Sequence, residues 1–202
     1  GVFFWLIWSG RNPEGVGDGS AHTAVIELDG VIAANAPASA VRVNGSLREA
    51  FKNKGVKGVI LKINSPGGSP VQAGQIYDEV RRLKAQNPQI PVYAVVEELC
   101  ASGGYYVAAG ADRIYVDKAS LVGSIGVIMD GFGFTGTMEK LGVERRALTA
   151  GTNKAFLDPF QPAVPSQIEH AKALLADIHA QFVDAVRKGR GKRLKETPDM
   201  FS

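Results

Sequence analysis

An α/β domain is the fold class that the sequence predicts, because β-branched runs alternate with stretches of helical periodicity along most of its 202 residues. Three runs rich in valine and isoleucine are typical of buried strands, at 23–32, 57–66 and 90–98. A stretch with helical character follows each of them. Strand–helix–strand units of this kind form parallel sheets through right-handed crossovers, so we expect one mainly parallel sheet covered by helices.

The helices are predicted from apolar residues that recur at helical spacing. Residues 46–54 and 71–86 each carry one apolar face. The two faces consist of Leu47, Ala50 and Phe51 in the first stretch, and of Ala73, Ile76, Tyr77, Val80 and Leu83 in the second. Shorter elements are predicted further along the chain, with strands at 112–120, 125–130 and 143–150 and a brief helix at 138–142.

The longest helix is predicted over residues 166–189. Pro165 and Ser166 open it, and Ser166 can form a capping box with Glu169. Gly189 stands where such a helix would stop. The chain therefore closes on a long C-terminal helix.

Composition restricts the class of protein. The chain is 45% hydrophobic and 21% charged, which suits a globular domain with a real core. Its formal net charge is +3, with a basic cluster at 187–195. That cluster suits a solvated helix end, with an anionic membrane or partner surface as the alternative. Nucleic-acid binding is not expected, because the basic residues are not spread over a face with aromatic residues between them.

No cofactor and no metal ion are expected. Cys100 is the single cysteine, which excludes an internal disulfide and a cysteine-based zinc cluster, and we expect it to be a small buried side chain. Residues 131–136 spell GFGFTG, but a dinucleotide site needs a long helix and an acidic residue about 20 positions on. Only a brief helix follows here, and position 153 is Asn.

Both ends of the chain look cut. Residues 2–8 are apolar and include two tryptophans, but they are too few to span a bilayer, which takes about 20 residues. We interpret 1–8 as the remnant of an N-terminal transmembrane anchor, 9–21 as a flexible linker, and 22–202 as one catalytic domain with a truncated C-terminus. A disordered chain end is the alternative for 1–8.

Ser102 is a lone hydroxyl among small and apolar residues, in the stretch CASGGYYVAAGAD at 100–112. It falls between a predicted strand and a predicted helix. One interpretation is a helix cap. The other is a nucleophile, because an N–H at Gly103 would then point at the oxyanion that attack by the hydroxyl creates.

A second turn, INSPGGS at 63–69, ends the preceding strand. Pro66 fixes the turn, while Gly67 and Gly68 can adopt positive φ and present bare backbone N–H groups. An ordinary strand-to-helix turn is the alternative. Together the two turns could supply one N–H each to an oxyanion, which is the arrangement that acyl transfer requires.

A nucleophilic serine needs a base. The three histidines, His22, His170 and His179, lie far from Ser102 in the sequence, so a Ser-His-Asp triad has poor support. A lysine can serve if burial lowers the pKa of its amine by roughly three units from about 10.4. Lys154 lies among small and apolar residues without an adjacent acid and is the best of several candidates, which include Lys62, Lys118 and Lys140.

Four motifs in order, INSPGGS, ELCASGGYYVAAGAD, SLVGSIGV and TAGTNKAFLDPF, resemble the bacterial signal peptide peptidase A family of membrane-anchored serine proteases. The resemblance runs from about Ile26 to the end of the chain. It implies a crotonase-like fold, shared with the Clp protease and built from ββα units. It also implies a location at the bacterial cytoplasmic membrane, with the catalytic domain on the extracytoplasmic side.

Site residues are carried over by the same resemblance. Ser102 is similar in position to the nucleophile and Lys154 to the general base. Ser124 is similar to the residue that orients the lysine amine. Gly68 and Gly103 match the oxyanion donors, with Gly67 as the alternative to Gly68. We also expect Leu121 and Val122 to contact apolar substrate.

The resemblance further implies that the chain is an endopeptidase that degrades cleaved signal peptides and other apolar peptides. Its partners would be copies of itself in a ring-shaped homo-oligomer, with serine and lysine contributed by neighbouring protomers. Two alternatives belong to other classes. A crotonase-type acyl-CoA enzyme would use the same N–H donors with Glu97 or Glu98 as acid or base. A non-catalytic membrane scaffold would need neither Ser102 nor Lys154.

Overall fold

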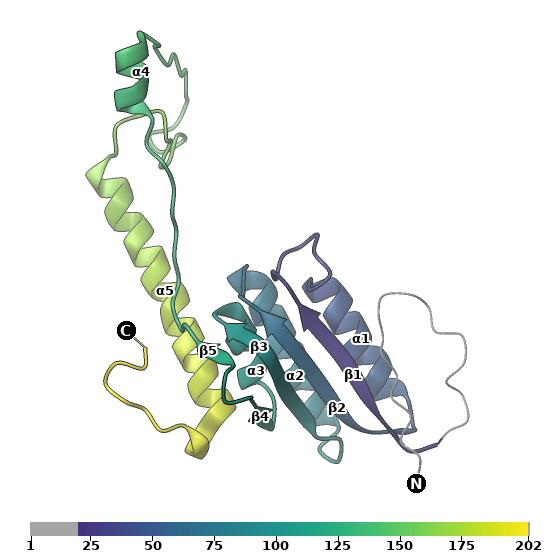
Figure 1. Cartoon of the computed structure of the whole chain (residues 1–202). Coiled ribbons are helices and arrows are strands. Elements are labelled where there is room, and N and C mark those ends of the chain that lie inside the picture. The colour runs from purple at the N-terminus through teal and green to yellow at the C-terminus, as the bar shows by residue number, and fades with distance from the viewer. Residues whose placement is uncertain (1–19, 202) are drawn as a thin grey trace. The chain divides into compact units, whose positions relative to one another are not determined.

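Residues 20–201 are described by the structure, a computed structural model, and they divide into two units (Figure 1). The first unit comprises residues 20–126 and 182–201, and the second comprises residues 127–181. The predicted anchor at 1–8 lies outside the described residues, as does nearly all of the predicted linker. Residues 22–201 of the two units lie within the stretch predicted as one catalytic domain, whose bounds stay a prediction.

A parallel sheet forms the centre of the first unit. Its strands lie in the order β1 (His22–Asp29), β2 (Val56–Ser65), β3 (Val92–Ala101) and β4 (Arg113–Tyr115). β5 (Leu121–Gly123) pairs with β3 further along the same strand. Every pairing is parallel, which confirms the predicted α/β class and brings the carboxyl ends of β1, β2 and β3 to one edge.

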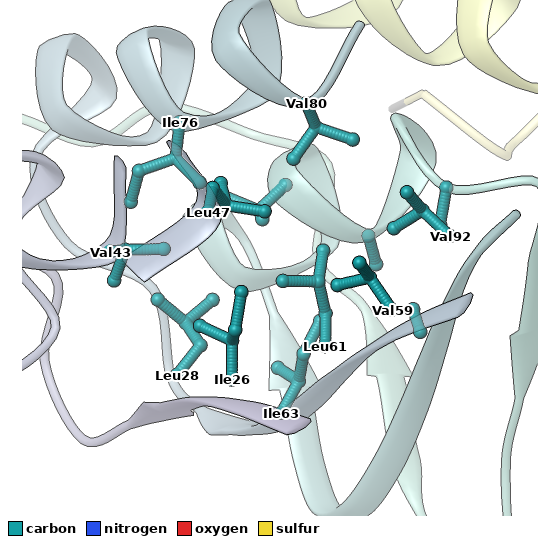
Figure 2. Close-up of a cluster of buried hydrophobic side chains, with 14 of the residues drawn as sticks. Ile26, Leu28, Val43, Leu47, Val59, Leu61, Ile63, Ile76, Val80 and Val92 are labelled. Atoms are coloured by element: carbon teal, nitrogen blue, oxygen red, sulfur yellow. The ribbon is translucent and has the colours of Figure 1, made fainter. Parts of the chain in front are cut away.

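Helices α1 (Ala40–Lys52), α2 (Pro70–Gln86) and α3 (Gly103–Ala109) follow β1, β2 and β3 in turn. Alternate strand residues face these helices because side chains in a strand point to opposite sides. Figure 2 shows the resulting core, in which side chains of β1, β2 and β3 meet those of α1 and α2. The labelled residues are Ile26, Leu28, Val43, Leu47, Val59, Leu61, Ile63, Ile76, Val80 and Val92.

α5 (Pro165–Arg190) is the predicted long C-terminal helix, and its last turns belong to the first unit. There the ring of Phe182 stacks on Tyr106 with 4.8 Å between the centroids. The Tyr77 hydroxyl donates a hydrogen bond of 2.9 Å to the Ala185 carbonyl. These contacts hold the end of α5 against α2 and α3. No helix within residues 20–201 has the length and apolar character that a membrane span requires.

The two ends of α5 differ in detail from the prediction. Ser166 is the second residue of the helix and not its cap, so the predicted capping box is wrong, and Glu169 pairs with Lys172 instead. Gly189 lies inside the helix, which continues to Arg190. A Cβ at position 189 would collide with the Ala109 carbonyl, so this glycine permits close packing and does not end the helix.

The second unit contains α4 (Thr135–Leu141) and the first turns of α5. Its loops are tied by an ion pair between Arg145 and Asp158 and by stacking of Phe134 on Phe160. The strand predicted at 143–150 is absent, and the one predicted at 125–130 is replaced by β5, which ends at Gly123. The strand-like pattern was misleading because neither segment has a pairing partner among the described residues.

Candidate active site

Ser102 connects β3 to α3 in an unusual backbone conformation, with φ 50° and ψ −121°. Positive φ is rare for a residue other than glycine and costs on the order of 1–3 kcal/mol, so the surrounding structure must hold it in place. Two hydrogen bonds do so: the Ser102 N–H donates to the Gly123 carbonyl at 2.8 Å, and its carbonyl accepts from the Tyr106 N–H at 3.0 Å.

The Ser102 hydroxyl does not cap α3. The residue occupies the N-cap position, but its side chain makes no cap hydrogen bond. The alternative of a simple helix cap is therefore wrong for this serine. A strained turn that leaves a partly exposed hydroxyl uncommitted suits a nucleophile better than a purely structural residue.

The glycine turn after β2 lies between two other loops. Gly67 has φ 94° and Gly68 has φ 147°, both in the region that favours glycine. The Gly67 carbonyl accepts from the Ile32 N–H at 2.8 Å, and the Ser69 N–H donates to the Ile32 carbonyl at 2.8 Å. A Cβ on Gly68 would collide with that same carbonyl. The segment around Ile32 thus supports the turn from one side.

The other side of the glycine turn contacts the Ser102 turn. A Cβ on Gly67 would lie only 2.6 Å from the Gly103 nitrogen and 2.8 Å from the Ser102 Cβ. A Cβ on Gly103 would lie 3.4 Å from the Gly68 nitrogen. The structure therefore brings Ser102, Gly67, Gly68 and Gly103 together, although the glycine turn and Ser102 lie more than 30 residues apart in the sequence.

The two glycines of the turn differ in their N–H groups. Gly67 is buried, and its N–H donates to the Ser65 Oγ at 3.1 Å. Gly68 is exposed. Within the described residues, neither the Gly68 N–H nor the Gly103 N–H donates to a carbonyl in a loop, turn or cap. Of the two alternatives for the oxyanion donor in this turn, the geometry favours Gly68.

β5 lies beside the Ser102 turn, and Ala101 pairs with Gly123. Ser124 follows with φ 54°, another positive φ for a residue other than glycine, and it is exposed. Leu121 and Val122 are also exposed, by 70% and 41%. Leu121 and Val122 therefore lie on an accessible strand next to the serine, and Ser124 lies just after the end of that strand.

Lys154 belongs to the second unit, whereas Ser102 belongs to the first. Lys154 is exposed and lies in a turn in which its N–H donates to the Gly151 carbonyl at 3.2 Å. The neighbouring Asn153 accepts a hydrogen bond from Gln167 on α5. The pairing of Lys154 with Ser102 stays a prediction.

Two other ionisable groups near the site, Cys100 and Lys62, are unsuited to act as nucleophile or base. Burial raises the pKa of the Cys100 thiol to about 12, so this cysteine stays protonated and is no nucleophile. The Lys62 amine lies 3.1 Å from the Glu97 carboxylate and 3.8 Å from Glu27. The hydrogen bond and charge of Glu97 raise the pKa of Lys62, which disfavours Lys62 as a neutral base.

The basic cluster at 187–195 is partly neutralised. Arg187 pairs with Glu196 at 2.7 Å, and Lys188 pairs with Asp184 on the preceding turn of α5. The Arg193 guanidinium donates to the Gly189 carbonyl at the helix end. These contacts agree with the interpretation of a solvated helix end.

Two residues of the site were missed by sequence reasoning. Ser65 and Ile32 both hold the glycine turn, through a side chain and through the backbone respectively. Ser65 is a polar residue just before Pro66, which is typical of any turn, so nothing in the sequence separated it from its neighbours. The sequence could not indicate Ile32, because this residue supports the glycine turn through its main-chain N–H and carbonyl groups, which every residue type except proline has.

A comparison with protein families supports the same region. A model described as peptidase family S49 matches residues 84–199, more than half of the chain, and this range includes Ser102, Ser124 and Lys154. The chain belongs to peptidase family S49. The expected crotonase/Clp-like fold, with its parallel sheet and long C-terminal helix, is confirmed for this S49 chain.

Individual relatives carry different names. A protein of Brucella melitensis named Na(+)/H(+) antiporter NhaA is 49% identical over 158 residues, which cover 78% of this chain and 21% of that protein. A protein of Enterococcus faecium named as a signal peptide peptidase, SppA, is 35% identical over 71% of this chain and 41% of its own length. Protease 4 of Haemophilus influenzae is 33% identical over 71% of this chain and 23% of its own length.

The S49 chain therefore spans less than half the length of each of these relatives. The names of these relatives belong to longer proteins.

Proposed function

We propose that this S49 chain carries the catalytic centre of a serine endopeptidase with Ser102 as its nucleophile. The observation that carries the proposal is the strained Ser102 turn, which leaves the hydroxyl uncapped beside the exposed Gly68 and the first N–H of α3. Membership of a peptidase family and relatives named as proteases support it.

The proposed reaction is acyl transfer through a covalent intermediate. Neutral Lys154 removes the proton of the Ser102 hydroxyl as its oxygen attacks the peptide carbonyl. The N–H groups of Gly68 and Gly103 bind the resulting oxyanion, and each such donor is worth about 3 kcal/mol in the transition state. The protonated lysine then gives its proton to the leaving amine as the C–N bond breaks. Water, deprotonated by the lysine, hydrolyses the ester and regenerates Ser102.

Ser124 has the proposed role of orienting the Lys154 amine. It follows directly on Gly123, whose carbonyl accepts the Ser102 N–H, so the backbone couples Ser124 to the nucleophile. A homo-oligomeric ring is part of the proposal, with Lys154 supplied to this centre by a neighbouring copy. A dyad within one chain is the alternative.

The proposed substrates are apolar peptides, including cleaved signal peptides. Leu121 and Val122 support this, because they expose aliphatic side chains on the strand beside Ser102. Attachment to the bacterial cytoplasmic membrane through an N-terminal anchor, of which residues 1–8 would be the remnant, is proposed with it, with the catalytic centre on the extracytoplasmic side. No cofactor takes part in the proposed reaction.

The decisive experiment measures hydrolysis of a fluorogenic apolar peptide by the wild type, Ser102→Ala and Lys154→Ala. Each substitution should lower kcat by at least about 10⁴-fold, as expected when a member of a catalytic set is removed. Lys140→Ala is the matched control, because Lys140 is an exposed lysine of the same unit. It should keep the wild-type rate. Wild-type turnover by Ser102→Ala would refute the proposal.

A further inference from the structure

Ser65 is a buried polar side chain that the proposed reaction does not use. It is the last residue of β2, it pairs with Cys100 of β3, and it has no exposed surface. A hydroxyl in such a place costs stability unless it is hydrogen-bonded. The Ser65 hydroxyl makes two hydrogen bonds.

Its two hydrogen bonds connect two different loops. The Ser65 hydroxyl donates to the Gly30 carbonyl at 2.6 Å and accepts from the Gly67 N–H at 3.1 Å. Gly30 lies at the end of β1, where the chain turns with φ 78°. The Ser65 side chain thus connects the glycine turn to the end of β1, the strand that pairs with β2.

Ser65 also packs against the first turn of α3. A Cβ on Gly104 would be 3.0 Å from the Ser65 carbonyl oxygen and 3.4 Å from its Cβ. The start of α3, directly after Ser102, therefore packs against Ser65, while the glycine turn is hydrogen-bonded to Ser65. A shift of Ser65 would be transmitted to both turns.

The bond to Gly67 decides which N–H group of the glycine turn is available. The Gly67 N–H points to the Ser65 Oγ and the Gly67 carbonyl accepts from the Ile32 N–H, so the two peptide planes that meet at Gly67 are both held. In the second of these planes the Gly68 N–H points away from Ile32, and Gly68 is exposed. An oxyanion donor must be fixed before the reaction, since a displacement of about 1 Å can cost 100-fold in rate.

We propose that Ser65 is a positioning residue that orients the glycine turn so that the Gly68 N–H faces the oxyanion formed at Ser102. This inference rests on the proposed peptidase function. Ser65 does not touch the substrate. Its role is to hold one donor in place, so its loss should weaken binding of the transition state more than binding of the peptide.

The test compares Ser65→Ala with Ser69→Ala in the full chain, with a fluorogenic apolar peptide as substrate. Both variants remove a serine hydroxyl from the same turn, but Ser69 only caps α2 by accepting from the Gln72 N–H. Ser65→Ala should lower kcat by about tenfold or more and leave KM within about twofold. Ser69→Ala should keep the wild-type kcat.

A peptide aldehyde provides the readout that a merely structural role would not change. It forms a hemiacetal with Ser102 whose oxygen occupies the oxyanion position. Its inhibition constant should rise in Ser65→Ala by the same factor by which kcat falls. Ser65→Cys, which retains a weaker donor and acceptor, should give intermediate values and serves as the test if the alanine variant fails to fold.

The outcomes separate the two proposals. A Ser65→Ala variant with wild-type kcat and aldehyde affinity, or with only a raised KM, would overturn the positioning role and leave Ser102 as the nucleophile. A wild-type chain without Ser102-dependent hydrolysis would overturn both.

Discussion

Gly103 and Gly74 are both helical glycines, but the space around their Cα atoms differs. A Cβ on Gly103 would lie 3.2 Å from the Ala73 Cβ and 3.4 Å from the nitrogen of Gly68, the other proposed oxyanion donor. A Cβ on Gly74 would meet only the Tyr106 hydroxyl, at 4.0 Å. Neither residue has positive φ, so alanine is conformationally acceptable at both positions.

Gly103→Ala should therefore lower kcat/KM by about tenfold or more, because the methyl group fills the space that the oxyanion needs. Gly74→Ala should keep the wild-type kcat/KM and raise the free energy of unfolding by about 0.5–1 kcal/mol, since alanine is the better helix former. Peptide hydrolysis and urea unfolding measure the two effects. Equal activities in the two variants would count against an oxyanion site at Gly103.

At the scale of single residues, the sequence was sufficient to predict site residues that differ clearly from their neighbours. Ser102 is a single hydroxyl among small residues, and Gly67 and Gly68 follow a proline, so both turns could be predicted. The contribution of Ser65 could not, because it depends on the Gly30 carbonyl, which is brought near by pairing of β1 with β2. A local sequence pattern does not predict contacts between segments that lie far apart along the chain.

Among the elements, α1 and α2 are joined by a carboxylate shared between two arginines. Glu79 on α2 is 7% exposed and accepts hydrogen bonds from Arg48 of α1 at 2.6 Å and from Arg82 one turn away at 2.7 Å. The bonds from Arg82, reinforced by Arg48, lower the pKa of the Glu79 carboxyl from 4.5 to about 2, and burial opposes them.

This lowered pKa predicts a pH dependence of stability. Because the folded pKa lies below the unfolded one, the stabilisation is complete above about pH 4.5 and is lost as the pH falls through about 2. It should amount to about 2 kcal/mol once the half-exposed arginines are allowed for. Urea unfolding between pH 5 and pH 2 should show this loss in the wild type and not in Glu79→Gln.

Glu144→Gln is the control for this measurement. Glu144 also pairs with an arginine, Arg146, but both side chains are largely exposed. Its removal should change the free energy of unfolding by less than about 0.5 kcal/mol at any pH. A wild-type pH slope retained in Glu79→Gln would assign the acid sensitivity to other carboxylates.

Element types were predictable where the partner of each element lies nearby in the sequence. β1, β2 and β3 have strong β-branched runs, and their helices have clear apolar faces. The prediction failed at 143–150, where no paired strand exists among the described residues. It also failed for Gly189, where close packing on α3 and not a helix end explains the glycine.

On the scale of the whole molecule, the second unit differs from the first because it exposes large apolar side chains to solvent. Ile128, Phe132, Leu141 and Leu148 are each at least 72% exposed, although the first unit buries most residues of this kind. Exposed apolar residues gathered in one region are typical of protein–protein contacts. They support the proposal that copies of the chain associate through this unit, which also contains Lys154.

Mixing two inactive variants tests this directly. If serine and lysine come from neighbouring protomers, co-assembled Ser102→Ala and Lys154→Ala chains should recover up to about a quarter of the wild-type activity, because random mixing leaves some sites with both native residues. Co-expression with two different affinity tags isolates the mixed oligomers before the peptide assay. Verified mixed oligomers without recovery would place the dyad within one chain.

The backbone at Ser102 has a consequence for how well this fold resists heat. A φ of 50° is a torsion that glycine adopts without penalty and serine does not. Replacing Ser102 by glycine should therefore make the fold more resistant to heat and should remove the hydroxyl that the proposed reaction needs. If Ser102 is the proposed nucleophile, thermal resistance and reactivity make opposite demands on this one position.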